Sequence, residues 1–106
     1  MSRPRKRAAV PRNAVHPGEM LREEFMVPLG ITAYRLAKEL RLPPPRVNDI
    51  VREKRGISAD TALRLSRYFG NSPEYWMNMQ ARYDLLIAQA NKEITRIRPR
   101  ERSAAA

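Results

Sequence analysis

The sequence has 106 residues, the size of a single compact domain with short terminal segments, which excludes two independent hydrophobic cores. Lys and Arg number 21 against 11 Asp and Glu, so the formal net charge of +10 indicates a polyanionic partner. The sequence contains no cysteine, which excludes disulfide scaffolds, thiolate metal sites and cysteine nucleophiles.

The positive charge is concentrated toward the two ends of the chain. Residues 1–15 contain five basic and no acidic side chains and few large apolar ones, which predicts a disordered basic arm. Residues 91–106 contain five basic and two acidic side chains, and we expect a basic flexible tail over 90–106. Residues 16–89 remain as the folded domain. The basic side chains of the arm are Arg3, Arg5, Lys6, Arg7 and Arg12.

Several classes of protein and site are not expected from this sequence. No apolar run reaches the roughly 18 residues of a membrane helix, and the N-terminus lacks the apolar stretch of a signal peptide. We therefore expect an unsecreted, cytoplasmic protein without a membrane partner. The single histidine, His16, precedes a proline at a helix start, where a capping or surface role is expected. Since no residues have metal-ligand spacing either, we expect no catalytic site, metal or cofactor.

The first two predicted helices follow one another closely. The first opens after His16, where Pro17 suits the first helical position, and it ends at Pro28 and Gly30. Thr32 is a good N-cap for a second helix of about nine residues, whose apolar side chains recur at helical spacing.

A run of three prolines at 43–45 then breaks the chain, and the third helix is predicted over about residues 44–52. Its apolar residues Val47, Ile50 and Val51 share one face, which we expect to be buried. The side chains left pointing outward are Arg46, Asn48, Asp49 and Arg52.

Two further helices have clear start signals. Ser58 caps the fourth helix, and Gly70 supplies its left-handed C-terminal residue. Ser72 and Pro73 open the fifth helix, which runs to about residue 89. Its apolar stripe is wider than a small bundle needs, so part of it is expected to cover a partner. The stripe consists of Trp76, Met79, Tyr83, Leu86 and Ile87.

The second and third helices match the plan of a helix-turn-helix, in which a tight turn lets the second helix project into the major groove of DNA. The N-terminal end of the third helix is expected to present unpaired backbone N–H groups to phosphates. Arg46 is placed to donate to guanine and Asn48 to pair with adenine. Arg52, Lys54 and Arg55 lie where the helix and the loop after it would pass a phosphate strand.

Other interpretations of the same residues exist. The two helices form a plain hairpin if the charged face only contacts solvent. The basic charge is also compatible with an RNA- or ribosome-associated adaptor whose helix-turn-helix contacts protein only. Long amide and guanidinium side chains on the exposed face favour DNA recognition over the adaptor. An enzyme is the least supported class, because the sequence shows no catalytic nucleophile together with a general base.

The motifs of residues 14–88 resemble those of the HigA-type antitoxins, of the Xre-like helix-turn-helix class. The segments that carry the resemblance are HPGE at 16–19, PLGIT at 28–32, YRLA at 34–37, RVNDIV at 46–51, KRGISADTALRL at 54–65, YFG at 68–70 and WMNMQ at 76–80. The resemblance implies an all-α, five-helix, lambda-repressor-like domain, usually dimeric. It further implies that the protein represses its own promoter and neutralises a HigB-type toxin, an mRNA-cleaving ribonuclease encoded alongside.

Two features depart from the usual pattern of the class. Arg41 stands in the turn where glycine is common, and a left-handed backbone there would cost about 1 kcal/mol. Prolines at 43–45 replace the commoner polar residues at the start of the recognition helix, so the operator preference cannot be transferred from relatives.

The predicted interfaces follow from these assignments. A single recognition helix contacts only a few base pairs, so we expect a homodimer that places two of them about 34 Å apart on a palindromic operator of double-stranded DNA. The expected DNA-binding residues are Thr32, Tyr34, Arg35, Pro44, Pro45, Arg46, Asn48, Asp49, Arg52, Lys54 and Arg55. The expected dimer-interface residues are Tyr75, Trp76, Met79, Tyr83 and Leu86.

Overall fold

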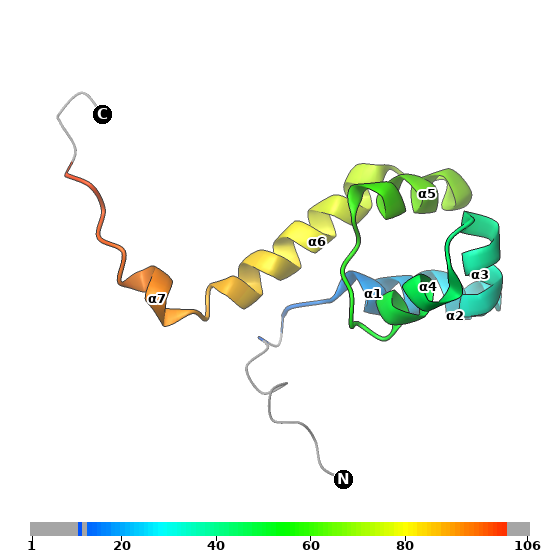
Figure 1. The fold of residues 1–106 in the computed structure, drawn as a ribbon, viewed down its shortest axis with the longest axis horizontal. Coiled ribbons are helices and arrows are strands. Elements are labelled where there is room, and N and C mark those ends of the chain that lie inside the picture. Colours follow the sequence, from blue (N-terminus) through cyan, green and yellow to red (C-terminus); the bar gives the residue numbers. More distant parts are fainter. Residues whose placement is uncertain (1–10, 12, 102–106) are drawn as a thin grey trace, which may run out of the picture.

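The computed structural model describes residue 11 and residues 13–101, and every regular element among them is a helix. Figure 1 shows the first elements gathered into a body from which the long α6 extends toward α7. The elements in chain order are α1 (Pro17–Met20), η2 (Leu21–Met26), α2 (Val27–Leu29), α3 (Ala33–Leu40), α4 (Pro44–Val51), α5 (Ala59–Phe69), α6 (Pro73–Ala88) and α7 (Lys92–Thr95). The all-α prediction is confirmed, and most of the predicted basic arm lies outside the described residues.

The first predicted helix is continuous but contains a wider turn. Segments α1, η2 and α2 follow one another with helical backbone, and η2 is a π-helix in which the N–H of Val27 donates to the carbonyl of Arg22. Pro28 lies inside this helix, whose last residue is Leu29 and whose C-cap is the left-handed Gly30, so the predicted end at Gly30 is confirmed, whereas Pro28 itself does not break the helix. A π turn just before the proline relieves the clash that its ring makes with an α-helical carbonyl.

His16 caps the start of this helix, as predicted. Its Nδ1 accepts the N–H of Gly18 at 2.8 Å, and its buried ring packs edge-on against Tyr83 of α6. Gly18 is required for packing, because a Cβ atom there would collide with the backbone carbonyl of Ile50 on α4. The close approach of these two backbones fixes α4 against the first helix.

A single core joins the helices of the body. Leu36, Ala62, Leu65 and Trp76 are fully buried at its centre, so α3, α5 and the start of α6 share one apolar interior. The predicted N-caps Thr32, Ser58 and Ser72 each accept a backbone N–H at the start of their helices. The core consists of Leu21, Met26, Leu36, Ala37, Leu40, Leu42, Val47, Ile50, Val51, Ile57, Ala62, Leu65 and Trp76.

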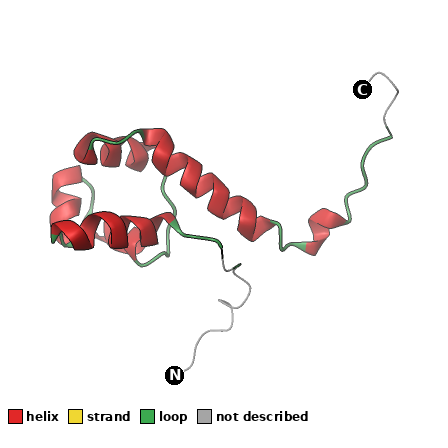
Figure 2. Cartoon of the chain, turned by 180° about the vertical axis from the view of Figure 1, so that it is seen from behind, coloured by secondary structure: helices red, strands yellow, loops and turns green. Residues whose placement is uncertain are grey.

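The C-terminal part of the chain leaves this body. Figure 2 shows α6 extending away from the other helices, with α7 beyond its end. The short α7, capped by the side chain of Asn91, was not predicted within the flexible tail. None of the described helices is both long and apolar enough to cross a membrane. The predicted five-helix body is therefore present, and a sixth, short helix follows it.

Candidate nucleic-acid interface

A short turn joins α3 to α4 and is held from both sides. Arg41 adopts the left-handed backbone conformation considered above, with φ 59° and ψ 44°. The N–H of Leu42 then donates to the carbonyl of Ala37 at 2.9 Å, and the Leu42 side chain is buried. From α5, the Arg64 guanidinium donates to the carbonyls of Leu40 and Arg41 at 2.8 and 3.1 Å. These bonds satisfy the last carbonyls of α3 and fix the crossing of the two helices.

The helix α4 presents a polar face to the outside. Val47 and Ile50 are each 1% exposed and anchor its inner face in the core. Because the inner face is anchored, the helix has no freedom to roll, and the outer side chains keep their order along the surface. On the outer face, Asn48 and Arg52 are exposed and Arg46 and Asp49 are half-buried.

The start of α4 offers no free backbone donors from its first turn. Pro43 is the N-cap, and Pro44 and Pro45 occupy the first two helical positions, so none of the three has an N–H. The next N–H, that of Arg46, donates to the carbonyl of Pro43 at 3.0 Å. The expectation that this helix end presents unpaired N–H groups to phosphates is therefore wrong, because the prolines remove them.

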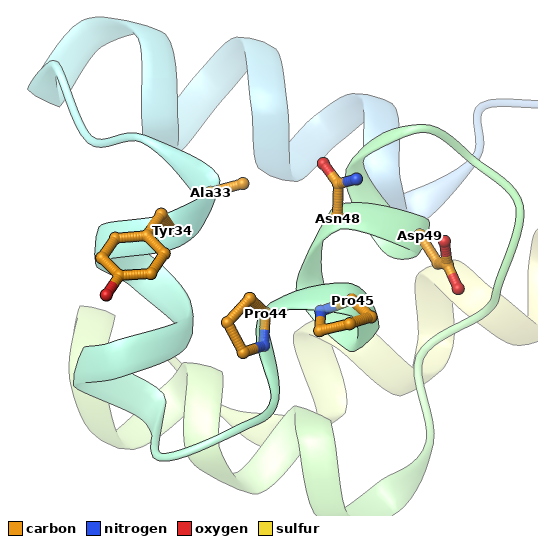
Figure 3. Close-up of a pocket in the computed structure, with 6 residues that line it drawn as sticks. All are labelled: Ala33, Tyr34, Pro44, Pro45, Asn48 and Asp49. Carbon is orange, nitrogen blue, oxygen red and sulfur yellow. The ribbon is translucent and has the colours of Figure 1, made fainter.

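An open hollow of about 320 Å³ lies between the starts of α3 and α4 (Figure 3). Figure 3 shows Pro44 and Pro45 side by side on the first turn of α4, with Tyr34 across from Pro44 on α3. Asn48 lies one turn further along α4. We call this feature the proline hollow; it is lined by Ala33, Tyr34, Pro44, Pro45, Asn48 and Asp49.

The start of α3 still offers backbone donors. The first N–H groups of a helix have no acceptor within it, and the Thr32 hydroxyl takes only that of Arg35, at 3.1 Å. Arg35 also pairs with Glu39 at 3.0 Å across one turn of the exposed helix face. The neighbouring Tyr34 has 65% of its surface exposed. This end of α3, rather than that of α4, therefore offers backbone N–H donors at the site.

The loop after α4 is tied to the first helix. Arg22 donates to the carbonyl of Val51 and pairs with Glu53 at 3.2 Å. Glu53 has a positive φ of 63°, so this ion pair holds a residue whose backbone is strained. Arg22 also bonds Glu23 at 2.9 Å, and these carboxylates raise the pKa of Arg22 against the opposing effect of burial. Arg22 therefore holds the C-terminal end of α4 and the start of its exit loop against the first helix.

The same loop is held at its other end by α6. The side-chain oxygen of Gln80 accepts the N–H of Ile57 at 2.7 Å. A Cβ atom at Gly56 would lie 2.8 Å from that oxygen, so the loop packs directly on the Gln80 amide. Lys54 and Arg55 are exposed on the segment between the two attachments. Their position is thus fixed from both sides of the loop.

The structure brings five of the predicted DNA-binding residues around the proline hollow and places three more along the end of α4 and its exit loop. Around the hollow are Tyr34, Pro44, Pro45, Asn48 and Asp49. Sequence reasoning missed Ala33, which lines the hollow, and the residues that hold the site: Arg22, Arg64 and Gln80. Ala33 directly follows the Thr32 cap and was predictable from it. The others act over long sequence separations that no local pattern indicates.

The predicted dimer residues on α6 differ in exposure. Trp76 is fully buried, and its indole N–H donates to Asn71 at 3.1 Å, so its assignment to a dimer interface is wrong. The ring packs against Phe25 with centroids 5.0 Å apart, which makes Trp76 part of the core. Tyr75 is 38% exposed, and burial, followed by the charge of Glu24, raises the pKa of Tyr75. The predicted residues Met79, Tyr83 and Leu86 are half-buried.

Two short helices joined by a fixed three-residue turn, with a polar outer face on the second, define a helix-turn-helix protein. A family model described as "Helix-turn-helix" matches residues 21–76. Virulence-associated protein I of Dichelobacter nodosus is 58% identical over 80 residues, which are 76% of this chain and 74% of that protein. Antitoxin HigA-1 of Vibrio cholerae serotype O1 is 36% identical over 74 residues, which are 70% of each protein.

Solved structures agree with this assignment. The structure of Pseudomonas aeruginosa antitoxin HigA with the higBA promoter matches with a TM-score of 0.79 and 50% identity, over 82% of this chain and 98% of that chain. Antitoxin GraA in complex with its operator matches with a TM-score of 0.78 and 41% identity, over 85% and 94% of the two chains. This chain therefore belongs to the helix-turn-helix family, and within it to the HigA-type antitoxins.

Proposed function

We propose that this protein is an antitoxin and transcriptional repressor that binds its own promoter as a dimer and neutralises a HigB-type toxin. The observation that carries the proposal is the anchored α4, whose outer face holds Arg46 and Asn48. Two of its structural neighbours, at 50% and 41% identity, are described with promoter or operator DNA. The likeness covers the whole helix-turn-helix, so we infer the same class of ligand for this chain.

The proposed contacts divide into two kinds. Arg46 and Asn48 contact base edges in the major groove, because guanidinium and amide groups match guanine and adenine. Arg52, Lys54 and Arg55 contact phosphates at the far end of α4. The start of α3, with Thr32, Tyr34 and Arg35, approaches phosphate through the backbone N–H groups that its cap leaves without an acceptor. The proposed DNA surface thus extends from the start of α3 to the exit loop.

The proposed dimer forms through α6. Tyr75, Met79, Tyr83 and Leu86 recur at helical spacing and keep part of their apolar surface outside the core. Pairing two such helices about a two-fold axis brings two recognition helices to successive turns of a palindromic site. Because its proposed ligand is double-stranded operator DNA, we expect the protein to act in the cytoplasm. The proposed function is binding, and we assign the chain no enzymatic role.

Exchanging the proposed base-contacting residues tests the DNA function directly. The change of Arg46 or Asn48 to Ala is expected to weaken binding to the DNA upstream of the protein's own gene by about 1–3 kcal/mol, with binding to random duplex almost unaltered. The matched control is Lys54→Ala, which should weaken both duplexes alike and flatten the salt dependence by about 0.9 in log–log slope. Fluorescence anisotropy titrations measure both quantities. Equal losses on both duplexes for Arg46→Ala and Asn48→Ala would refute base recognition by α4.

The toxin partner is tested separately. Co-expression with the product of the short reading frame adjacent to its own gene is expected to suppress mRNA cleavage by that product and to yield a co-purifying complex. A neighbouring frame whose product cleaves RNA equally with and without this protein would contradict the antitoxin role and leave the repressor role standing.

A further inference from the structure

The proline hollow is largely apolar, which is unusual for the N-terminal end of a recognition helix. Ala33, Pro44 and Pro45 provide apolar surface, and the Tyr34 ring adds an aromatic wall (Figure 3). The polar groups of the hollow, Asn48 and Asp49, come from the second turn of α4. The recognition helix of a helix-turn-helix contacts base edges through its N-terminal residues, so this hollow lies where bases are contacted.

Hydrogen-bond accounting excludes several occupants. The N-cap Pro43 and the first two residues of α4 have no N–H, and the Arg46 N–H donates to the carbonyl of Pro43. On the α4 side of the hollow, a phosphate oxygen or the acceptor edge of guanine would therefore lose its water without gaining a backbone donor. The Asp49 carboxylate at the rim of the hollow further disfavours an anion. The hollow thus fits an apolar group that is carried on DNA.

Thymine is the base whose major-groove edge carries an apolar group, the C5-methyl. We propose that the proline hollow takes the methyl group of a thymine in each operator half-site, with Pro44 and Pro45 in contact with it. Asn48, one turn further along α4, then faces the adjacent position, where its amide suits an adenine. This inference rests on the proposed DNA-binding function and adds to it a base and a specificity-determining pair, Pro44 and Pro45.

Replacing thymine by deoxyuridine tests the proposal with a single chemical change. Deoxyuridine lacks only the methyl group and keeps every hydrogen-bonding atom, so a scan of the operator thymines isolates the apolar contact. The wild-type protein is expected to bind about fourfold more weakly when the contacted thymine is replaced in one half-site, the ratio that corresponds to about 0.8 kcal/mol for a buried CH₂ group. Replacement in both half-sites multiplies the two losses to about fifteenfold.

Matched variants assign the effect to the hollow. The double variant Pro44→Ser/Pro45→Ser is expected to bind the thymine and deoxyuridine operators equally, because polar side chains then replace the apolar wall. Pro43→Ser is the control: residue 43 is the N-cap and does not line the hollow, so this variant should keep the methyl preference. Circular dichroism melting verifies that both variants fold.

Each outcome of the scan has one meaning. Specific operator binding without any deoxyuridine position that weakens it twofold would overturn the proline hollow as a thymine site and leave the repressor function intact. A methyl effect that persists in the double variant would overturn it as well. If the wild type binds no upstream duplex more tightly than random DNA, the proposed repressor function fails, and this inference fails with it.

Discussion

The Gln80 amide links the exit loop of the recognition helix to α6, and its removal has a calculable effect. Gln80→Met keeps the length of the side chain but removes the acceptor of the Ile57 N–H, which bonds it at 2.7 Å. A net hydrogen bond is worth about 1 kcal/mol, and a donor left without a partner in a half-buried place costs about 1–3 kcal/mol. We therefore expect a loss of about 1–2 kcal/mol in the free energy of unfolding.

The same change is expected to alter DNA binding in a specific way. Lys54 and Arg55 lie on the loop that Gln80 holds, and each proposed phosphate contact contributes about 0.9 to the slope of log affinity against log salt. Gln80→Met should flatten that slope by up to about 1.8, while the ratio of operator to random affinity stays near that of the wild type. Anisotropy titrations between about 50 and 200 mM salt measure the slope.

Two controls make the result interpretable. Asp84→Ala removes only the exposed acceptor of the Gln80 side-chain N–H, at 3.0 Å, and should change neither stability nor slope appreciably. Adding Gln80→Met to a Lys54→Ala/Arg55→Ala variant should flatten the slope no further, since the contacts are already lost. A Gln80→Met protein with reduced stability but a wild-type slope would refute the reasoning, because the loop would then keep its shape without the amide.

Three further outcomes are expected. Arg41→Gly should raise the free energy of unfolding by about 1 kcal/mol in urea titrations, because glycine adopts the left-handed backbone without strain. Glu53→Gly should bring no such gain, since it also breaks the ion pair with Arg22. Equal gains from the two variants would contradict this account. Trp76→Ala should cost about 3–5 kcal/mol, a large part of the stability of so small a domain, and circular dichroism melting would reveal it. Leu86→Glu should convert the proposed dimer to a monomer in light scattering, and an unchanged dimer would exclude this stripe as the interface.

Local signals made most of the helix boundaries predictable. Thr32, Ser58 and Ser72 were identified as N-caps from sequence, and the structure places each hydroxyl on a backbone N–H three residues ahead. Such bonds involve neighbouring residues only, so tertiary packing does not override them. The π turn was not predicted, because a proline such as Pro28 usually indicates a helix break. No local pattern shows that a wider turn before the proline lets the helix continue.

Contacts between residues far apart in the chain could not be predicted from the sequence. Arg22 reaches Glu53 over 31 residues, and Gln80 reaches Ile57 over 23, through side chains of ordinary type at ordinary spacing. Trp76 was misassigned for a related reason: an apolar stripe on a helix has the same period whether it faces the core or a partner. The missing donors of α4 were different, since three consecutive prolines predict that loss directly from covalent structure.

The outward course of α6 has a consequence for how concentration affects the protein. Trp76 is its single buried residue within the described chain, and among the described residues the ring contact furthest along α6 is that of Tyr83 with His16. A helical end that lacks tertiary support is marginal in water, since isolated helices below about 12–15 residues do not persist. We therefore expect dilution below the dissociation constant of the proposed dimer to melt the end of α6, which would make its helical content and its subunit association one equilibrium.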